Sequence, residues 1–348
     1  MSNASEKQTG RATLIEVATR AGVSATTASL VLSGKARSRR ISADAHSRVQ
    51  LAAEELNYAP NLLVRSLRRG RTHIVSFYNA FRTRESHDMY MDKLSAAVEY
   101  AGGTLGYDIL VHCRFGRSPK ETYEFLNGGL ADGVLLFAPR LDDPMVALLR
   151  RSNLPVVLLN TRDPLREFPS VADDGLTGIT SVAEALVGAG HRHIAAVSSE
   201  GPTVRDGNLR ITRLKTELGR LGVDLPDEHI FDSGKDYVEL VTRILNTAPQ
   251  TTALFCWHDR LAYQVLEACE ILKISIPSRL SIVGYDGLRW PSSTSHTAAS
   301  VHVQLDLLAE RGMHLLDQYI QGYQGPLLEE SMPTLFDPGT TLRPPKQS

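Results

Sequence analysis

Residues 13–34, TLIEVATRAGVSATTASLVLSG, and residues 58–71, YAPNLLVRSLRRGR, decide how this 348-residue chain is organised. The first stretch predicts two short helices that cross closely, because Ala18, Gly22 and Ala28 are small where a helix-turn-helix needs small residues. The second stretch predicts a short basic segment that joins the helices to the rest of the chain. The two stretches together predict a compact helical head.

The helix ends in the head carry recognisable signals. Thr13 and Glu16 have the spacing of a capping box, in which each side chain bonds to the backbone of the other residue. Gly22 stands where the first helix needs a left-handed residue to end. Ser24 can cap a second helix, and Ser42 can cap a third that runs to about Leu56.

The segment after the third helix has its own character. Pro60 prevents the helix from continuing, and Asn61 can cap residues 62–69, which are rich in leucine and arginine. Such a short segment is not stable alone as a helix in water, so it would fold when a partner copy and a DNA groove supply contacts. A leucine presented to the minor groove can wedge apart a base step. The helices alone would also suit a three-helix bundle without any DNA role.

Charge divides the chain at the same place. Residues 1–73 contain 12 Lys and Arg against 5 Asp and Glu, whereas residues 74–348 contain 26 against 34. A basic head on an acidic body indicates that the head meets a polyanion. We expect residues 1–10 to be a disordered terminus or a tag.

Composition excludes several classes of protein. Apolar residues make up 42% of the chain and charged residues 22%, as in ordinary globular proteins. No apolar run is long enough to span a membrane and no secretory segment begins the chain, which favours the cytoplasm. The cysteines (Cys113, Cys256 and Cys269) have neither disulfide nor metal spacing. His191 and His193 lack neighbouring ligands, so we expect no metal and no cofactor.

From His73 onward, short apolar strands alternate with amphipathic helices, which predicts parallel sheets built from βαβ units. The series restarts after Asp173 and Asp174, so we expect two similar α/β lobes with a ligand where strand carboxyl ends meet. The predicted strands cover residues 74–77, 108–111, 133–137, 156–159, 193–197, 253–255 and 281–284. The predicted helices cover about residues 91–103, 119–130, 176–189, 211–221 and 260–272.

Short sequence motifs occur along the chain. Those in the head are TLIEVA, AGVSxxT, RIS, AAxELxYxPN and RSLRxGRT, and those in the body include ADGVLL, LPVVLL, TALF and IPxxLSIVGYD. With these motifs the chain resembles the lactose-repressor/galactose-repressor (LacI/GalR) family of bacterial transcription regulators. The resemblance covers nearly the whole chain. It implies an all-α helix-turn-helix headpiece with a hinge helix, followed by an α/β periplasmic-binding-protein-like type I effector domain of two Rossmann-like lobes.

The resemblance also implies domain bounds and partners. We expect the headpiece at 11–60, the hinge helix at 61–72, the ligand-binding and dimerisation domain at 73–342 and a disordered tail at 343–348. The family acts as homodimers on near-palindromic operator DNA, mostly as repressors, under the control of a small effector that is often a sugar. Whether the effector induces or co-represses stays open.

The resemblance places the recognition helix at residues 24–33 and the intercalating leucine at Leu67. Ala25 and Thr26 occupy base-reading positions but are too short for bidentate contacts to purines, and Leu30 replaces a frequent arginine. Direct readout is therefore expected to be modest, with DNA deformation contributing more. The predicted DNA-binding residues are Thr13, Ser24, Ala25, Thr26, Thr27, Ser29, Leu30, Ser33, Tyr58, Asn61, Arg65 and Leu67.

The effector site follows from family positions at strand ends. Arg210 and Asp259 match an arginine clamp and an acidic acceptor that suit vicinal hydroxyls, with Trp257 as a stacking face. His258 stands where asparagine is usual; it could contact the ligand or only bond a backbone carbonyl. The predicted effector-binding residues are Asn79, Arg82, Tyr90, Asn160, Arg210, Trp257, His258, Asp259 and Asp286.

Two other functions are compatible with parts of the sequence. The body alone would suit a solute-binding module without a DNA role, and an α/β enzyme could use the same strand ends. The basic head and the lack of a secretory segment argue against the first. No nucleophile elbow, P-loop or dinucleotide fingerprint supports the second, so we expect no enzymatic activity.

Overall fold

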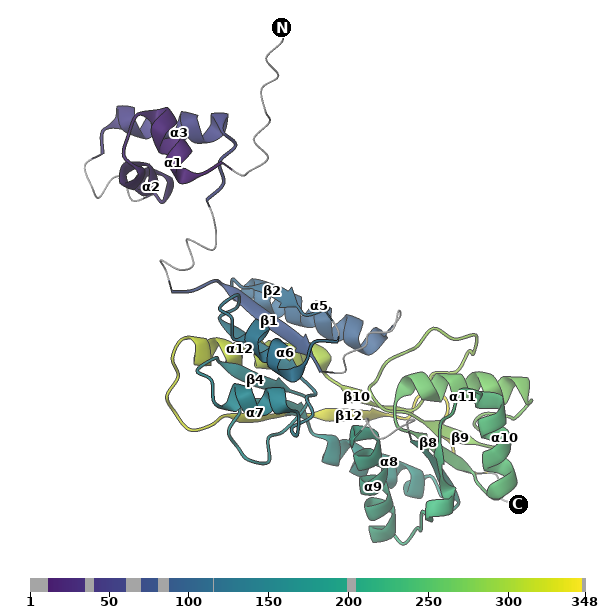
Figure 1. Ribbon diagram of the computed structural model, residues 1–348. Helices are drawn as coiled ribbons and strands as arrows, with labels where there is room; N and C mark the ends of the chain where they lie inside the picture. The colour runs from purple at the N-terminus through teal and green to yellow at the C-terminus, as the bar shows by residue number, and fades with distance from the viewer. Residues whose placement is uncertain are drawn as a thin grey trace. The chain divides into compact units, whose positions relative to one another are not determined.

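The computed structural model describes residues 12–34, 41–60, 70–80, 88–114, 116–198 and 205–345, with side chains from residue 209 onward in the last range. The chain divides into two compact units, Met1–Thr72 and His73–Ser348 (Figure 1). Residues 1–10 and most of the predicted hinge helix, residues 61–69, lie outside the described part.

The described residues of the headpiece contain three helices, α1 (Leu14–Ala21), α2 (Ala25–Leu32) and α3 (Ala43–Glu55). The predicted caps are confirmed: Thr13 and Glu16 form a complete capping box, and the side chains of Ser24 and Ser42 accept from the helix amides. Gly22 adopts the left-handed conformation with a φ of 63° at the end of α1. Small and branched side chains from all three helices form the headpiece core, so the predicted close crossing is also confirmed.

The first lobe is built on a sheet with the strand order β11-β5-β4-β3-β1-β2, and all its pairs are parallel. Its strands are β1 (Ile74–Asn79), β2 (Asp108–Val111), β3 (Gly133–Phe137), β4 (Val156–Leu159), β5 (Ser170–Asp173) and β11 (Glu329–Met332). Its helices are α5 (Met89–Thr104), α6 (Pro119–Leu126), α7 (Pro144–Arg150) and α12 (Leu305–Ile320). We call this the N-lobe.

The second lobe, the C-lobe, has a parallel sheet with the order β7-β6-β8-β9. Its strands are β6 (Ile194–Ser198), β7 (Ile230–Asp232), β8 (Ala253–Cys256) and β9 (Ser281–Val283). Its helices are α8 (Gly175–Gly188), α9 (Arg205–Arg220), α10 (Tyr237–Thr247), α11 (Asp259–Ile271) and the short 3-10 helix η2 (Asp227–His229).

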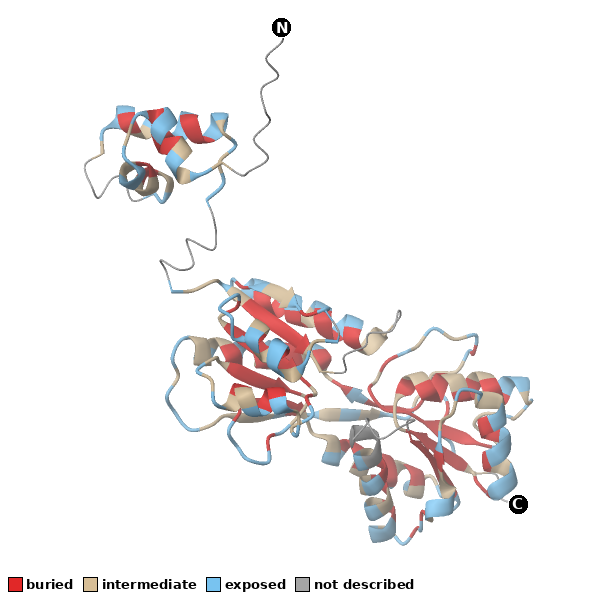
Figure 2. Ribbon diagram, viewed as in Figure 1, coloured by how far each residue is buried: buried red, intermediate tan, exposed pale blue. Residues whose placement is uncertain are grey.

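Alternation along the strands gives each sheet two apolar faces. In β3, Leu135 and Phe137 face the core under α5 and α12, whereas Val134 and Leu136 face α6 and α7. Such continuous apolar strands are typical of parallel sheets that are covered on both sides. Buried residues accordingly fill both sheets and the inner helix faces (Figure 2).

The chain passes between the lobes three times. The first passage leads from β5 into α8, the second runs through β10 (Ser300–Val303) into α12, and the third runs from β11 into β12 (Thr334–Asp337). Strands β10 and β12 pair antiparallel between the lobes (Figure 1). One apolar cluster continues from the N-lobe through these passages into the C-lobe.

The predicted architecture of a helical headpiece followed by two α/β lobes is confirmed. One helix ends earlier than expected: α6 ends at Leu126 instead of 130, because Asn127 caps it and Gly129 turns the chain with a φ of 81°. The described chain also continues past residue 342, where the amide of Arg343 donates to Ser281 and its carbonyl contacts the His191 ring. Among the described residues, no helix is both long and apolar enough to cross a membrane.

Candidate DNA-binding face and interlobe site

Helix α2 presents two different faces. Ala28 and Val31 are buried in the headpiece core, whereas Ala25 and Thr26 are exposed at its first turn. Ser24 caps this turn by accepting a hydrogen bond from the Thr27 amide at 3.1 Å. The exposed turn therefore carries only short side chains at the helix N-terminus, a place that suits phosphate or thymine-methyl contacts better than bidentate base readout.

Other residues predicted to bind DNA also have structural partners. The Thr13 hydroxyl lies 3.0 Å from Oε2 of Glu16 within the capping box, and Ser33 donates to the Leu30 carbonyl. Ser29 and Leu30 are half-buried, and Tyr58 packs against the headpiece core. The remaining predicted contacts, Asn61, Arg65 and Leu67, lie outside the described residues.

Arg210, on helix α9, is the centre of a polar cluster between the lobes. Its Nη1 donates to the Trp257 carbonyl at 2.7 Å, and its Nη2 lies 3.4 Å from Oδ1 of Asp286. Its guanidinium carbon sits 3.8 Å from the centroid of the Tyr285 ring. The side chains of Arg210 and Asp286 are 13% and 10% exposed, so this pair operates in a poorly hydrated environment.

Tyr285 connects the cluster to the N-lobe. Its ring is fully buried behind β9, and its hydroxyl donates to Oδ2 of Asp173 at 3.2 Å. Asp173 ends β5, so this hydrogen bond joins the carboxyl ends of strands from both sheets. Neither residue was among the predicted effector-binding residues, although both lie at the carboxyl ends of apolar strands, where ligands of such folds bind.

The N-lobe contributes Tyr90 and Asn160. Nδ2 of Asn160 donates to the Tyr90 hydroxyl at 3.3 Å, and the Tyr90 ring lies 5.9 Å from that of Phe137. Burial raises the pKa of Tyr90 well above its usual value, and the Asp286 and Asp173 carboxylates raise it further. Oδ1 of Asn160 is buried without a hydrogen-bond partner in the described structure. A buried acceptor of this kind favours a ligand hydroxyl or a water as its partner.

Asp286 has a strongly shifted pKa. Burial raises its pKa to about 7, the attraction of Arg210 opposes this rise, and repulsion from Asp173 adds to it. Its backbone is also unusual, with a φ of 111°. Perturbed carboxyl groups of this kind gather at functional sites.

Trp257 and His258 stack at the edge of the same cluster, with ring centroids 4.2 Å apart. Nδ1 of His258 accepts from the Leu261 amide at 2.9 Å, so His258 caps helix α11 instead of bonding a backbone carbonyl. The pKa of His258 is lowered to about 3, mainly by burial and in addition by the charges of Arg210 and Arg260. The imidazole is therefore neutral at physiological pH and keeps Nε2 as a donor.

Asp259 is placed differently from the expectation of an acceptor facing a ligand. It is fully buried, and its carboxylate accepts from the Leu288 amide at 2.6 Å and from the Ser300 hydroxyl at 2.7 Å. A Cβ atom at Gly284 would collide with the same carboxylate. In this structure Asp259 joins α11 to the segment that leads from β9 to β10.

Asn79 and Arg82 complete the predicted set. Asn79 ends β1 and lines a small hollow at the far edge of the N-lobe sheet, and Arg82 lies outside the described residues. In the part of the chain that the structure describes, no group of three or more His, Cys, Asp or Glu side chains is arranged to hold a metal ion.

Comparison with known proteins decides the family. Residues 13–61 match the family described as bacterial regulatory proteins, lacI family, and residues 183–341 match the periplasmic binding protein-like domain. The chain belongs to the LacI family of bacterial regulatory proteins. The predicted recognition is therefore confirmed, and so is the role of a DNA-binding transcriptional regulator with an effector domain.

Curated relatives match this LacI-family chain along nearly its whole length. It is 25% identical over 336 residues to the HTH-type transcriptional repressor PurR of Escherichia coli O139:H28, covering 94% of this chain and 96% of that protein. It is 25% identical over 315 residues to the ribose operon repressor of Escherichia coli K12, covering 88% and 92%.

Solved structures share the fold. The lac repressor dimer bound to operator and the anti-inducer ONPF matches with a TM-score of 0.78 and 21% identity, covering 95% of this chain and 99% of that chain. The transcriptional regulator CelR–cellobiose complex matches with a TM-score of 0.66 and 23% identity, covering 95% and 100%.

Proposed function

We propose that this regulator is a repressor that binds a near-palindromic operator as a homodimer. Its affinity for the operator changes when a small polyhydroxy ligand binds at the interlobe cluster. The observation that carries the proposal is the meeting of Arg210 and Asp286 from the C-lobe with Asp173 from the N-lobe around one tyrosine. A ligand that exchanges these contacts for its own must change how the two lobes hold each other.

The chemistry of the cluster favours hydroxyl groups. Carboxylates accept from hydroxyls, the guanidinium of Arg210 donates to them, and the orphaned Oδ1 of Asn160 accepts one more. The Trp257 ring at the rim offers an apolar face to C–H edges. A sugar or a similar polyol combines these features, as do the cellobiose and ribose named for two of the structural relatives.

The coupling to DNA is a linkage between two sites. A ligand that binds one lobe arrangement better than another shifts the population toward it, and the operator does the same through the headpieces. The two effects are reciprocal, so operator DNA changes ligand affinity by the factor by which the ligand changes operator affinity. We place this regulator in the cytoplasm, where operator DNA is found, and we expect it not to turn its ligand over.

A thermal-shift screen tests the proposal. Sugars, sugar acids, phosphates and nucleosides would be added to the full-length protein, because a ligand bound only by the native state raises its melting temperature. Each compound that stabilises the protein would then be tested for its effect on operator affinity and for chemical turnover. A stabilising sugar that leaves operator affinity unchanged would contradict the coupling.

The variant Arg210→Gln makes the assignment specific. It removes the charged donor of the cluster but keeps a polar side chain with an unbranched aliphatic stem, so we expect the stabilising compound to bind at least about tenfold more weakly. Arg220→Gln is the matched control, because Arg220 lies on the same helix and its side chain is 57% exposed. An unchanged response in Arg210→Gln would remove Arg210 from the effector site.

A further inference from the structure

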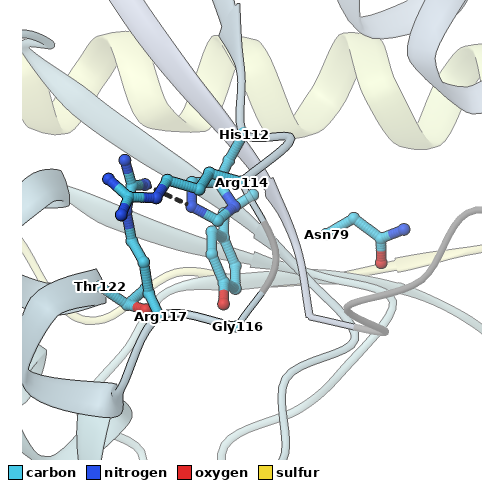
Figure 3. A pocket seen from close by; sticks show the side chains of 7 residues that line it. Asn79, His112, Arg114, Gly116, Arg117 and Thr122 are labelled. Atoms are coloured by element: carbon cyan, nitrogen blue, oxygen red, sulfur yellow. Dashed lines mark hydrogen bonds between the residues drawn. The ribbon is translucent and has the colours of Figure 1, made fainter.

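A small basic hollow lies at the edge of the N-lobe, where β1 and β2 end and α6 begins. His112, Arg114 and Arg117 line it together with Tyr78, Asn79 and Thr122. Tyr78, His112 and Thr122 are buried and form its floor, whereas Arg114 is exposed and Arg117 is half-buried at its rim. The side chains of His112, Arg114 and Arg117 come together on one side, and Asn79 points away from them (Figure 3). We call this hollow the basic pocket.

Aromatic contacts hold the inner side of the basic pocket in place. The Arg117 guanidinium carbon lies 4.1 Å from the Phe125 ring centroid, and its Nη1 donates to Nε2 of His112 at 2.6 Å. The His112 ring packs between Phe125 at 5.5 Å and Tyr78 at 4.8 Å. Stacking thus fixes the position of the Arg117 guanidinium, which favours binding of an anion.

The two arginines of the basic pocket differ in their pairing from three other arginines of the N-lobe. Arg140, Arg150 and Arg166 in the same lobe each pair with a carboxylate. Among the described residues, by contrast, neither Arg114 nor Arg117 forms an ion pair.

Glu121, in the first turn of α6, has a pKa that both arginines of the pocket influence. Hydrogen bonds from Ser118 are the main cause of its lowered pKa, and the two arginines lower it further. Its carboxylate accepts a hydrogen bond from the Ser118 amide at 2.8 Å in the capping box of α6. Among the described residues, it forms no ion pair with either arginine.

We propose that the basic pocket binds a phosphate group, either as inorganic phosphate or as a phosphate monoester. Two guanidinium groups match the oxygens of a phosphate dianion in geometry and in charge. A partly buried site of this kind strengthens the attraction relative to open solvent. The pocket is made by other residues than the interlobe cluster, so the proposal does not depend on the proposed effector site.

The test measures binding of inorganic phosphate to the full-length protein by calorimetry and by thermal shift, at ionic strength matched with chloride. We expect the melting temperature of the wild type to rise with phosphate concentration. Arg114→Gln/Arg117→Gln should bind phosphate at least about tenfold more weakly, because charge-assisted hydrogen bonds are lost. Arg140→Gln, which alters an exposed arginine of the same lobe, should bind it like the wild type.

Arg114→Gln alone guards against misfolding, because Arg114 is exposed and is not part of the Phe125 stack. It should weaken phosphate binding by severalfold, with the circular dichroism spectrum and operator affinity unchanged. Glycerol phosphate distinguishes the two sources. If glycerol phosphate bound at least about tenfold more tightly than inorganic phosphate, the pocket would be assigned to a phosphate monoester. If the two bound equally, it would be assigned to inorganic phosphate. An absence of phosphate-specific stabilisation in the wild type, or equal stabilisation in all the variants, would overturn the proposal.

Discussion

Single buried charges in this protein are stabilised by many short contacts, and Asp163 shows how. Its carboxylate is fully buried and accepts two hydrogen bonds from Arg150, both at 2.7 Å. The amides of Leu165, Glu167 and Phe168 donate to it as well. Burial raises the pKa of Asp163, but these hydrogen bonds outweigh that effect and lower it to about 2. The loop between β4 and β5 is organised around this one ion.

Asp163→Asn should lower the free energy of unfolding by about 3 kcal/mol, because it leaves the buried Arg150 with only the exposed Glu167 as a counter-charge. The carboxylate contributes stability above its unfolded pKa of 3.8 and loses this contribution as the pH falls toward about 2. The difference between wild type and variant should therefore shrink across that window. Urea unfolding at several pH values measures it.

Asp142→Asn is the matched control for Asp163→Asn. The side chains of Asp142 and its partner Arg140 are 69% and 63% exposed, and such pairs contribute at most about 1 kcal/mol. Equal losses in the two variants would show that burial of the Asp163 pair contributes nothing.

Asp259 supports a second residue-scale prediction. Because its carboxylate accepts from Leu288 and Ser300 inside the protein, Asp259→Ala should cost about 2–4 kcal/mol of stability. Any loss of the effector response would then follow from this disturbance of the segment between β9 and β10. Thermal and urea unfolding report the stability, with the exposed Asp227→Ala as control. Unchanged stability with a lost response would instead return Asp259 to the ligand contacts.

At the scale of elements, helix α8 determines how closely the passages between the lobes can approach. A Cβ atom at Gly178 would lie 2.8 Å from the Tyr285 hydroxyl and 2.9 Å from Cγ1 of Val301. Gly178 thus lets α8 touch β10 and the tyrosine that joins the two sheets. The contact couples a helix of the C-lobe directly to the passages.

Gly178→Ala should therefore destabilise the protein and shift the Tyr285–Asp173 contact, whereas Gly188→Ala should not. At Gly188, on the same helix, an added Cβ meets nothing within 4 Å, so alanine should be neutral or stabilise by up to about 1 kcal/mol. Thermal unfolding of both variants and their response to the stabilising ligand test this. A neutral Gly178→Ala would mean that the passages can separate at little cost.

Elements with strong local signals could be predicted from the sequence, and the connecting elements could not. The strands at 133–137 and 156–159 were predicted with the bounds that the structure has, because continuous apolar runs mark strands buried on both faces. The bounds of the strand at 108–111 were also predicted, although this edge strand is only partly buried. Strands β10, β11 and β12 were missed. They are short and, in β11 and β12, mostly half-exposed, and only their tertiary neighbours make them strands.

The interlobe cluster was only partly predictable for a similar reason. Arg210, Asp286, Tyr90 and Asn160 were assigned to the site through family positions, and the structure brings them together. Tyr285 and Asp173 were not, because a residue at a strand end shows no partner in the sequence when that partner lies in another lobe. The same holds for Arg117 and His112, whose contact depends on how the loop before α6 folds back.

At the scale of the whole molecule, we expect the specificity for DNA to be divided between two segments. The exposed turn of α2 offers Ala25 and Thr26, which cannot form bidentate hydrogen bonds to a base. Specific affinity must then depend more on bending the operator, which is the role that the family resemblance gives to the arginine-rich residues 62–69 and to Leu67. These residues lie outside the described part, so their role stays a prediction from the sequence.

Leu67→Ala should weaken specific operator binding by at least about tenfold, because the wedge that favours bent DNA is lost. Non-specific binding should persist with an unchanged salt dependence, since the Lys and Arg side chains that release counterions are all retained. Fluorescence anisotropy with operator and random duplexes at several salt concentrations measures both terms. Leu51→Ala is the control, because Leu51 is an exposed leucine of the headpiece, 57% accessible, on α3. If Leu67→Ala weakened both duplexes equally, Leu67 would act through general headpiece affinity, and specificity would have to reside in the short side chains of α2.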